Sequence, residues 1–234
     1  MANAAARPNS NWRQFVVKLN RFEFQLLGAA MTDGFLLTWC GDSHARNAYQ
    51  RSHVITGTFP VAPTVSFVGR GGLTINTFNR NHLHEAFEDH AYSGMYRIAV
   101  VFLGSNDIDV ATWPADTPLN VPANKLLALR QELLLSYDMV FVIGIPECDI
   151  CRRENAQLVH QIFLRCNQQL NDVLRGYYIK LPNMAFNWES TRRFSPDDVH
   201  HSNRIYNSIV RLVGQRLLGV MEGDRRYVGV NEDV

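Results

Sequence analysis

The chain has 234 residues, of which 46% are hydrophobic and 19% are charged. This composition is typical of one globular domain with a full core, and it excludes a disordered chain. The 23 Lys and Arg residues nearly balance the 22 Asp and Glu residues, and the formal charge of +1 argues against a protein whose main task is to bind a nucleic-acid backbone.

No membrane-spanning or secretory segment is evident in the sequence. No apolar run approaches the roughly 20 residues needed to cross a bilayer. Residues 1–10 lack the apolar core of a signal peptide. We therefore expect a cytoplasmic protein without a membrane span. Residues 1–30 include an aromatic-rich amphipathic stretch, NWRQFVVKLNRFEFQLL, which predicts a helical N-terminal extension.

Five short apolar runs follow, and they alternate with segments of helical period. Several runs are almost continuously apolar, which is typical of strands buried on both faces of a parallel sheet. The runs are Phe35–Cys40, Thr64–Val68, Arg97–Leu103, Met139–Ile145 and Tyr177–Leu181. Strands that alternate with helices predict right-handed crossovers. The fold class is therefore predicted to be a three-layer α/β/α domain with a five-stranded parallel sheet.

Three segments between or after these runs carry apolar stripes at helical spacing. The first begins near Pro122, a residue suited to a first helical turn. The stripes are Leu126, Leu127, Leu133 and Leu134 in the first segment, Leu158, Ile162, Cys166, Leu170 and Val173 in the second, and Ile205, Ile209, Leu212, Val213 and Leu217 in the third. The second segment runs from Glu154 to Leu174, and the third ends near Gly219. The domain is thus predicted to span residues 31–221, with a polar tail at 222–234.

Polar and glycine-rich segments come directly after the first three strands, and one precedes the last helix. They are Gly41-Asp42-Ser43-His44, Gly69-Arg70-Gly71-Gly72, Gly104-Ser105-Asn106-Asp107 and Pro196–His201. Ligands of open parallel sheets collect outside the carboxyl ends of the strands. A serine between a strand and a helix has its N–H at a helix N-terminus, which favours developing negative charge. Each segment alone is also explained by caps and turns, but together they predict a serine nucleophile with oxyanion donors and an Asp/His pair.

These segments resemble the conserved blocks of the SGNH (GDSL-type) hydrolases, over roughly Phe35 to Leu218. The first block is similar to LTWCGDS, the second to Ser66–Thr74, the third to G-x-N-D and the fifth to D-x-x-H. The resemblance assigns the nucleophile to Ser43, the oxyanion donors to the Ser43 and Gly72 N–H groups and Asn106, the acid to Asp197 and the base to His200. It implies a flavodoxin-like SGNH hydrolase architecture and a serine esterase that cleaves a carboxylic ester through an acyl-enzyme, with no metal and no organic cofactor.

The resemblance leaves the acyl group, the alcohol and the oligomeric state open. Members of the family act on acetylated sugars, phospholipid-like esters, thioesters and simple lipids, so we expect a small-molecule, lipid or sugar ester as substrate. One alternative is an acyltransferase. Another is a non-catalytic module with a vestigial triad, in which the N-terminal stretch, Arg152-Arg153 and Arg192-Arg193 bind a protein or nucleic acid. Nucleic acid is not expected as a partner of this domain alone.

The D-x-x-H block offers two registers, Asp197 with His200 and Asp198 with His201. We expect the first, because Asp198-Val199 then supplies the polar and aliphatic residues that the family places between acid and base. His201 is then expected to face solvent, and Ser202 or Asn203 to cap the last helix.

Three further groups of side chains have less specific signals. Cys148 and Cys151 form a C-x-x-C, for which free thiols are the favoured interpretation over a redox or metal role. A second possible metal set, favoured instead as a solvated surface, consists of His82, His84, His90, Glu85 and Glu88. Pro146-Glu147 and Asn187-Trp188 are predicted to border the substrate pocket, with Trp188 either its apolar wall or ordinary core.

Overall fold

The sheet has five strands, all parallel, in the order β2-β1-β3-β4-β5. This computed structural model describes residues 31, 33–87, 95–108, 113–146, 149–181 and 200–221. The strands are β1 (Phe35–Gly41), β2 (Thr64–Gly69), β3 (Tyr96–Phe102), β4 (Met139–Ile143) and β5 (Tyr178–Ile179). The predicted five-stranded parallel sheet is therefore confirmed, with its first three strands within one residue of the expected bounds.

The last two strands are shorter than the sequence pattern predicts. Beyond Gly144, the backbone of Ile145 pairs with a side chain rather than with β5: Asn167 Oδ1 accepts from Ile145 N at 2.8 Å, and Asn167 Nδ2 donates to Ile145 O at 3.0 Å. On the β5 side, Tyr177 belongs to a 3-10 turn, η4 (Arg175–Tyr177). Only two residues of β5 are therefore left to pair with β4.

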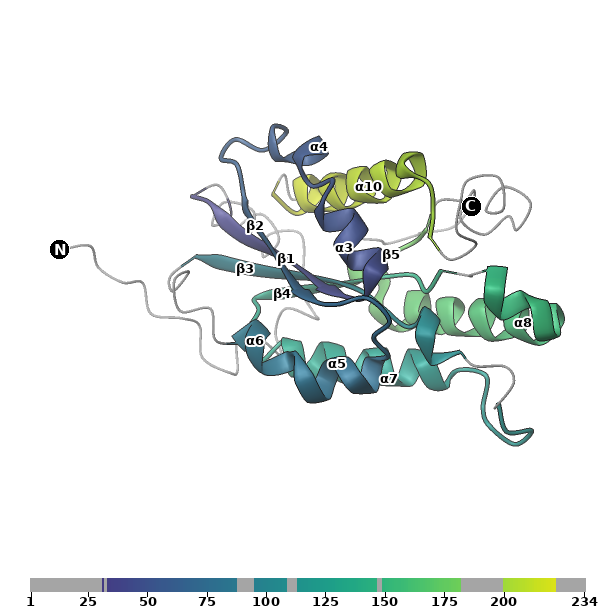
Figure 1. The fold of residues 1–234 in the computed structure, drawn as a ribbon. Coiled ribbons are helices and arrows are strands. Elements are labelled where there is room, and N and C mark those ends of the chain that lie inside the picture. The colour runs from purple at the N-terminus through teal and green to yellow at the C-terminus, as the bar shows by residue number, and fades with distance from the viewer. Residues whose placement is uncertain are drawn as a thin grey trace.

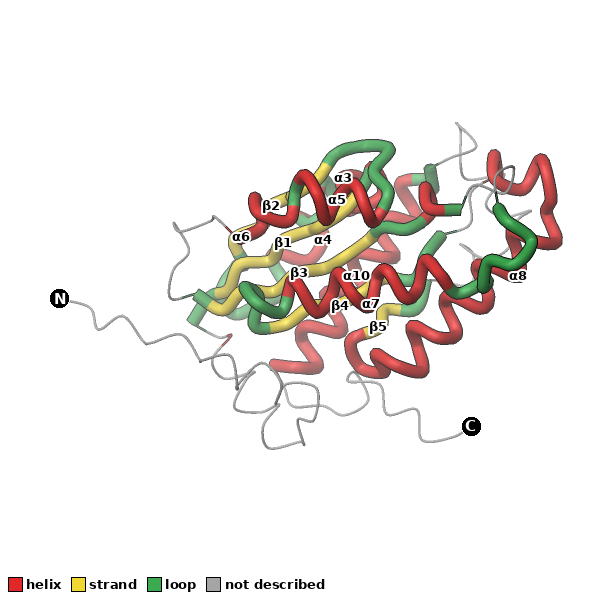
Figure 2. Tube along the Cα trace, turned by 90° about the horizontal axis from the view of Figure 1, so that it is seen from below, coloured by secondary structure: helices red, strands yellow, loops and turns green. Residues whose placement is uncertain are grey.

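Helices cover both faces of the sheet, so the expected three layers are confirmed. One face carries α3 (Ser43–Tyr49), α4 (His53–Thr56) and α10 (Asn203–Met221). The opposite face carries α5 (Ile75–Asn81), α6 (Leu83–Phe87), α7 (Val121–Leu133) and α8 (Asp149–Leu174). Figure 1 shows the sheet between these two sets, and Figure 2 shows α5 and α7 lying across it. Within the described residues, no helix has the length and apolarity of a membrane span.

The long helix α8 differs from its predicted stripe at one position. Asn155 has a non-helical backbone and its Oδ1 accepts from Leu158 N at 3.0 Å, so the regular helix begins close to the predicted Glu154. Val173 is 56% exposed, whereas Leu174 is buried. The prediction for Val173 was wrong because the stripe continues in steps of four residues from Leu170, which brings residue 174 onto the buried face.

The carboxyl end of β1 lies where the strand order reverses, between β2 and β3. In the flavodoxin-like order, this switch point is where open sheets bind ligands. Gly41 and Gly69 are paired at the ends of their strands, with φ of +149° and +132°. A Cβ on Gly69 would lie 1.9 Å from Gly41 O, so only glycine permits this approach. The loops that leave β1 and β2 are thereby brought together.

Candidate functional site

Ser43 is the first residue of α3, directly beyond β1. Asp42 is the helix cap, and its Oδ1 accepts from His44 N at 2.8 Å. The first turn of a helix presents N–H groups without an intrahelical acceptor. The structure therefore places the Ser43 side chain, 9% exposed, beside such amides at the carboxyl edge of the sheet.

Asn106 links the first three sequence blocks. It lies in a 3-10 turn, η3 (Ser105–Asp107), which follows β3 and is preceded by Gly104 with φ of +118°. Its Nδ2 donates to Asp42 Oδ2 at 3.0 Å and to Leu73 O at 3.0 Å. One amide group thus joins the residue before the candidate nucleophile to the loop after β2.

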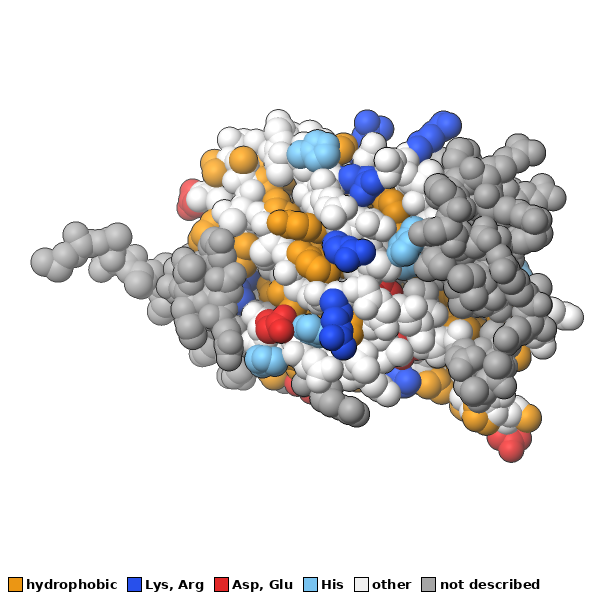
Figure 3. All heavy atoms as spheres, in the orientation of Figure 1, with side chains coloured by type: hydrophobic (Ala, Val, Ile, Leu, Met, Phe, Trp, Pro, Cys, Tyr) orange, Lys and Arg blue, Asp and Glu red, His pale blue; other side chains and the backbone are white. Residues whose placement is uncertain are grey.

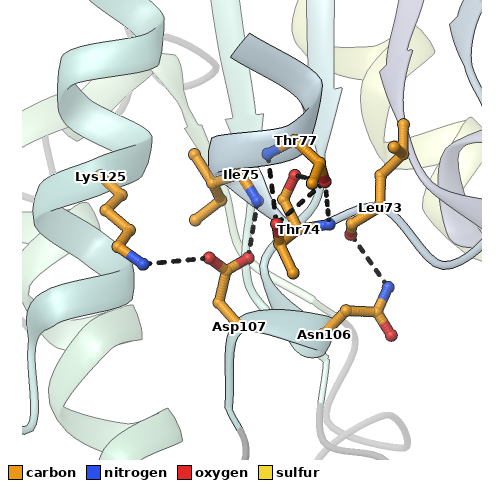
Figure 4. Close-up of polar contacts among 7 residues, drawn as sticks. All are labelled: Leu73, Thr74, Ile75, Thr77, Asn106, Asp107 and Lys125. Atoms are coloured by element: carbon orange, nitrogen blue, oxygen red, sulfur yellow. Dashed lines mark hydrogen bonds and ion pairs between the residues drawn. The ribbon is translucent and has the colours of Figure 1, made fainter. Parts of the chain in front are cut away.

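Asp107 fixes the far end of the same loop, as Figure 4 shows. Its Oδ2 accepts from Ile75 N, the first residue of α5, at 2.8 Å, and its Oδ1 lies 3.4 Å from Lys125 Nζ. Burial raises the pKa of Asp107, while the Ile75 N–H and the Lys125 charge act in the opposite direction. Thr74 and Thr77 add a reciprocal cap to the same helix end. The loop from residue 70 to residue 74 is therefore held by η3 as well as by its own helix.

The proximity to Ser43 and the left-handed backbone belong to two different glycines of this loop. Gly72, the predicted oxyanion donor, has φ of +75° and is exposed. Gly71 lies nearer to the serine, since a Cβ added to it would be 3.8 Å from Ser43 Cβ. The structure therefore brings the loop to Ser43 through Gly71 and assigns the left-handed backbone to Gly72.

Asp42 is a buried carboxyl whose role the sequence did not indicate. Burial raises its pKa to about 7, against the opposing effects of the His44 N–H, the Ser105 hydroxyl and the nearby charge of His200. Its Oδ2 also accepts from Ser105 Oγ at 3.4 Å. The G-D-S motif therefore positions its neighbours through the aspartate.

His200 lies close to the serine-bearing helix, with its ring centroid 5.4 Å from that of His44. Asp197, Asp198 and the predicted pocket residues Glu147, Asn187 and Trp188 lie outside the described residues. Of the predicted acid–base pair, His200 lies within the described residues and Asp197 does not.

The expectation that His201 faces solvent was wrong. His201 is 4% exposed, and its ring packs against His44 at 5.5 Å and Tyr206 at 5.8 Å. Burial lowers its pKa to about 4, and the charge of His200 adds to this effect. A histidine that stays neutral can be buried against aromatic rings, which is why its polarity did not predict its position. Ser202 does occupy the cap position of α10, since its carbonyl accepts from Ile205 N and Tyr206 N, although its Oγ lacks a partner among the described residues.

The possible metal and thiol groups are only partly within the described residues. His82 Nδ1 and Glu85 Oε2 lie 3.0 Å apart, and no set of three potential ligands converges in the part of the chain that the structure describes. His90, Glu88 and Cys148 lie outside it. Cys40 and Cys166 are buried free thiols, and burial raises their pKa values to about 12 and about 11.

Neither a protein-family model nor a curated protein matches the sequence. Solved structures do share the fold. A protein described as a candidate acylhydrolase, from Bacteroides fragilis, aligns with a TM-score of 0.55 at 13% identity, over 80% of this chain and 88% of its own. A lipolytic protein of the G-D-S-L family from Veillonella parvula gives 0.50 at 13%, over 76% and 94%. A variant of an acetyl xylan esterase from Geobacillus stearothermophilus gives 0.52 at 15%, over 80% and 95%.

The structural neighbours are thus GDSL/SGNH-type esterases and acylhydrolases, as the sequence resemblance implied. Their strand arrangement matches the five-stranded parallel sheet with flanking helices described above. At these identities, the likeness concerns the fold.

Proposed function

We propose that the protein is a serine esterase of the SGNH type, which hydrolyses a carboxylic ester through an acyl-enzyme. Ser43 Oγ attacks the acyl carbon while His200 accepts its proton. Asp197 orients the imidazole and stabilises its charged form. The intermediate then collapses, the alcohol leaves with the proton from His200, and water attacks the acyl-Ser43 with His200 as the base. The acid product and the free serine are released.

The observation that carries this proposal is the pair of hydrogen bonds donated by the Asn106 side-chain amide. An oxyanion formed at Ser43 needs donors that are fixed before the reaction. Asn106 Nδ2 is held by Asp42 Oδ2 and Leu73 O, both at 3.0 Å, beside the serine and the loop that contains Gly72. Since both of its hydrogens already have acceptors, donation to an oxyanion requires Asn106 to share or redirect one of them. Leu73 O, a neutral acceptor, is the one more readily given up.

The proposed substrate is an ester of a small molecule, a lipid or a sugar. The fold neighbours include an acetyl xylan esterase and a lipolytic protein, and they favour this class without selecting among its members. On the face drawn in Figure 3, Lys and Arg side chains are interspersed with apolar, histidine and other side chains rather than segregated into one block.

A panel of p-nitrophenyl esters of rising acyl length tests the proposed reaction. We expect turnover of at least one ester by the wild type, and its loss in Ser43→Ala. Ser208→Ala, a matched change on α10 where the hydroxyl donates to Arg204 O, should keep full activity. Equal turnover by Ser43→Ala would overturn the proposal. Faster product formation with an added alcohol would favour the acyltransferase alternative, and no turnover of any ester would favour the non-catalytic one.

A further inference from the structure

A hydrogen bond between two side chains 162 residues apart connects the helix of Ser43 to the last helix. His44 Nδ1 lies 2.8 Å from Tyr206 Oη, and both residues are buried. His44 directly follows the proposed nucleophile, whereas Tyr206 lies in the first turn of α10, six residues beyond His200. The bond therefore spans the two chain segments that carry the proposed nucleophile and base.

Tyr206 makes a second polar contact with the helix of Ser43. Asn47 Nδ2 donates to Tyr206 Oη at 3.4 Å, so the tyrosine oxygen already accepts one hydrogen bond. Both of these contacts of Tyr206 Oη are with residues of α3, the helix that carries Ser43.

The ring of His44, which makes this hydrogen bond, also packs against the proposed base, His200. The centroid of His44 lies 5.4 Å from that of His200 and 5.5 Å from that of His201, and Phe102 packs at 5.4 Å from another side. His44 therefore touches the loop that leads into α10 as well as the helix itself. A shift of its ring would shift His200 relative to Ser43.

The last helix also packs against α4 and against the turn between α3 and α4. A Cβ added to Gly214 of α10 would lie 2.8 Å from Ile55 Cγ2 of α4. Arg51 Nη2 donates to Asn203 Oδ1, and the Arg51 guanidinium lies 5.4 Å from the centre of the Tyr206 ring. This face of the domain therefore keeps its packing without the tyrosine hydroxyl, so that removing the hydroxyl alone should change the site and not the fold.

We propose that His44 and Tyr206 are positioning residues, whose hydrogen bond and ring contacts hold His200 in register with Ser43. The inference rests on the proposed esterase function. A misplacement of about 1 Å between reacting groups can cost up to ~10²-fold in rate. Loss of the bond should therefore reduce the chemical step more than substrate binding.

Three variants separate the bond from the ring contacts. Tyr206→Phe removes only the hydroxyl, His44→Phe keeps a ring without a hydrogen-bonding nitrogen, and His44→Asn keeps a hydrogen-bonding group near the Nδ1 position without the ring. We expect Tyr206→Phe and His44→Phe each to lower kcat by about 10- to 100-fold, with KM within twofold. Each should also show the small loss of stability in urea that follows when a buried hydrogen-bond partner is removed, while the protein remains folded. The double Phe variant should lose little more than either single one. His44→Asn should recover part of the loss. Tyr49→Phe, on α3, is the control and should match the wild type.

The rate of fluorophosphonate labelling at Ser43 tests the positioning role separately from the proposed esterase function. If the wild type is labelled and Tyr206→Phe is labelled equally fast, the positioning role is wrong while the esterase proposal stands. If the wild type is not labelled, the esterase proposal fails and the positioning role fails with it. The ¹⁵N spectrum of the histidines provides an independent check, since the Nδ1 signal of His44 should move in Tyr206→Phe. An unchanged signal would contradict the bond itself.

Discussion

The Asn106 side-chain amide donates a hydrogen bond of 3.0 Å to Asp42 Oδ2, across 64 residues of sequence. The same nitrogen donates to Leu73 O at 3.0 Å. These bonds connect the loops after β1, β2 and β3 at the point where the strand order reverses. The position of the proposed oxyanion donor is therefore set by two other parts of the proposed site.

Replacement of Asn106 by alanine should remove a donor and release both loops. We expect kcat to fall by about 10²–10³-fold, because an oxyanion donor of this kind typically contributes that much. The free energy of unfolding should fall by about 2 kcal/mol, because two hydrogen bonds are lost and each usually contributes about 1 kcal/mol net. Ester hydrolysis and urea unfolding of Asn106→Ala measure the two effects. Asn79→Ala, at an exposed position on α5, is the control and should keep the kcat of the wild type. If Asn106→Ala lowered kcat no more than this control does, Asn106 would not be an oxyanion donor.

The two glycines of the β2 loop should respond differently to alanine. Gly72 has φ of +75°, where an L-residue costs about 1–2 kcal/mol, so Gly72→Ala should lower both stability and kcat. Gly71→Ala should be nearly neutral for stability, because its Cβ would meet Ser43 Cβ at an ordinary 3.8 Å. Its methyl group should instead reduce kcat/KM for the longer acyl chains. Thermal unfolding and the ester panel give both quantities, and equal losses of stability in the two variants would contradict this account.

The buried His201 should make the protein sensitive to acid. Its pKa is lowered from 6.5 to about 4, so the unfolded state binds more protons between these pH values. The contribution of His201 to the free energy of unfolding should therefore be fully present above pH 6.5. It should fall by roughly 3 kcal/mol as the pH drops to 4. The loss should be smaller in His201→Phe.

Asp42 acts in the opposite direction over much of the same range. Burial raises its pKa from 3.8 to about 7, so ionisation lowers stability as the pH rises between these values. The informative quantity is therefore the difference in urea-unfolding free energy between the wild type and His201→Phe at pH 4.5 and pH 7.5. A difference that does not change with pH would show that His201 is charged or exposed. His53→Gln, in α4, is the control.

The same histidines decide the register of the D-x-x-H block. His200→Ala should abolish ester hydrolysis, because the group proposed to accept the serine proton is then missing. His201→Phe should keep kcat within a few-fold of the wild type while it changes the pH dependence of stability. Loss of turnover in the second variant alone would shift the base to His201 and the acid to Asp198.

Local sequence signals predicted the sheet and the positions of the candidate site. Apolar runs bounded by glycines define β1 to β3, and the motifs that follow them place Ser43 and Asn106 at one edge. The early end of β4 depends on Asn167, a side chain of α8 that takes the place of a strand partner for Ile145. No local pattern contains that information.

The surroundings of His44 and His201 could not be predicted from the sequence either. A polar residue beside a helix start is usually exposed, and His201 became buried only because rings from two other helices meet it. The bond from His44 to Tyr206 joins residues 162 positions apart. Such contacts follow from the packing of α3 against α10, which periodicity within either helix does not specify.

Mass spectrometry of the fluorophosphonate-treated protein is the most direct test that Ser43 is an activated nucleophile. We expect one adduct per chain, on the peptide that contains Ser43, formed by the wild type and absent from Ser43→Ala. Denatured wild type should not react, since activation requires the folded site. An adduct on another serine, or equal labelling of Ser43→Ala, would contradict the assignment of this protein's nucleophile.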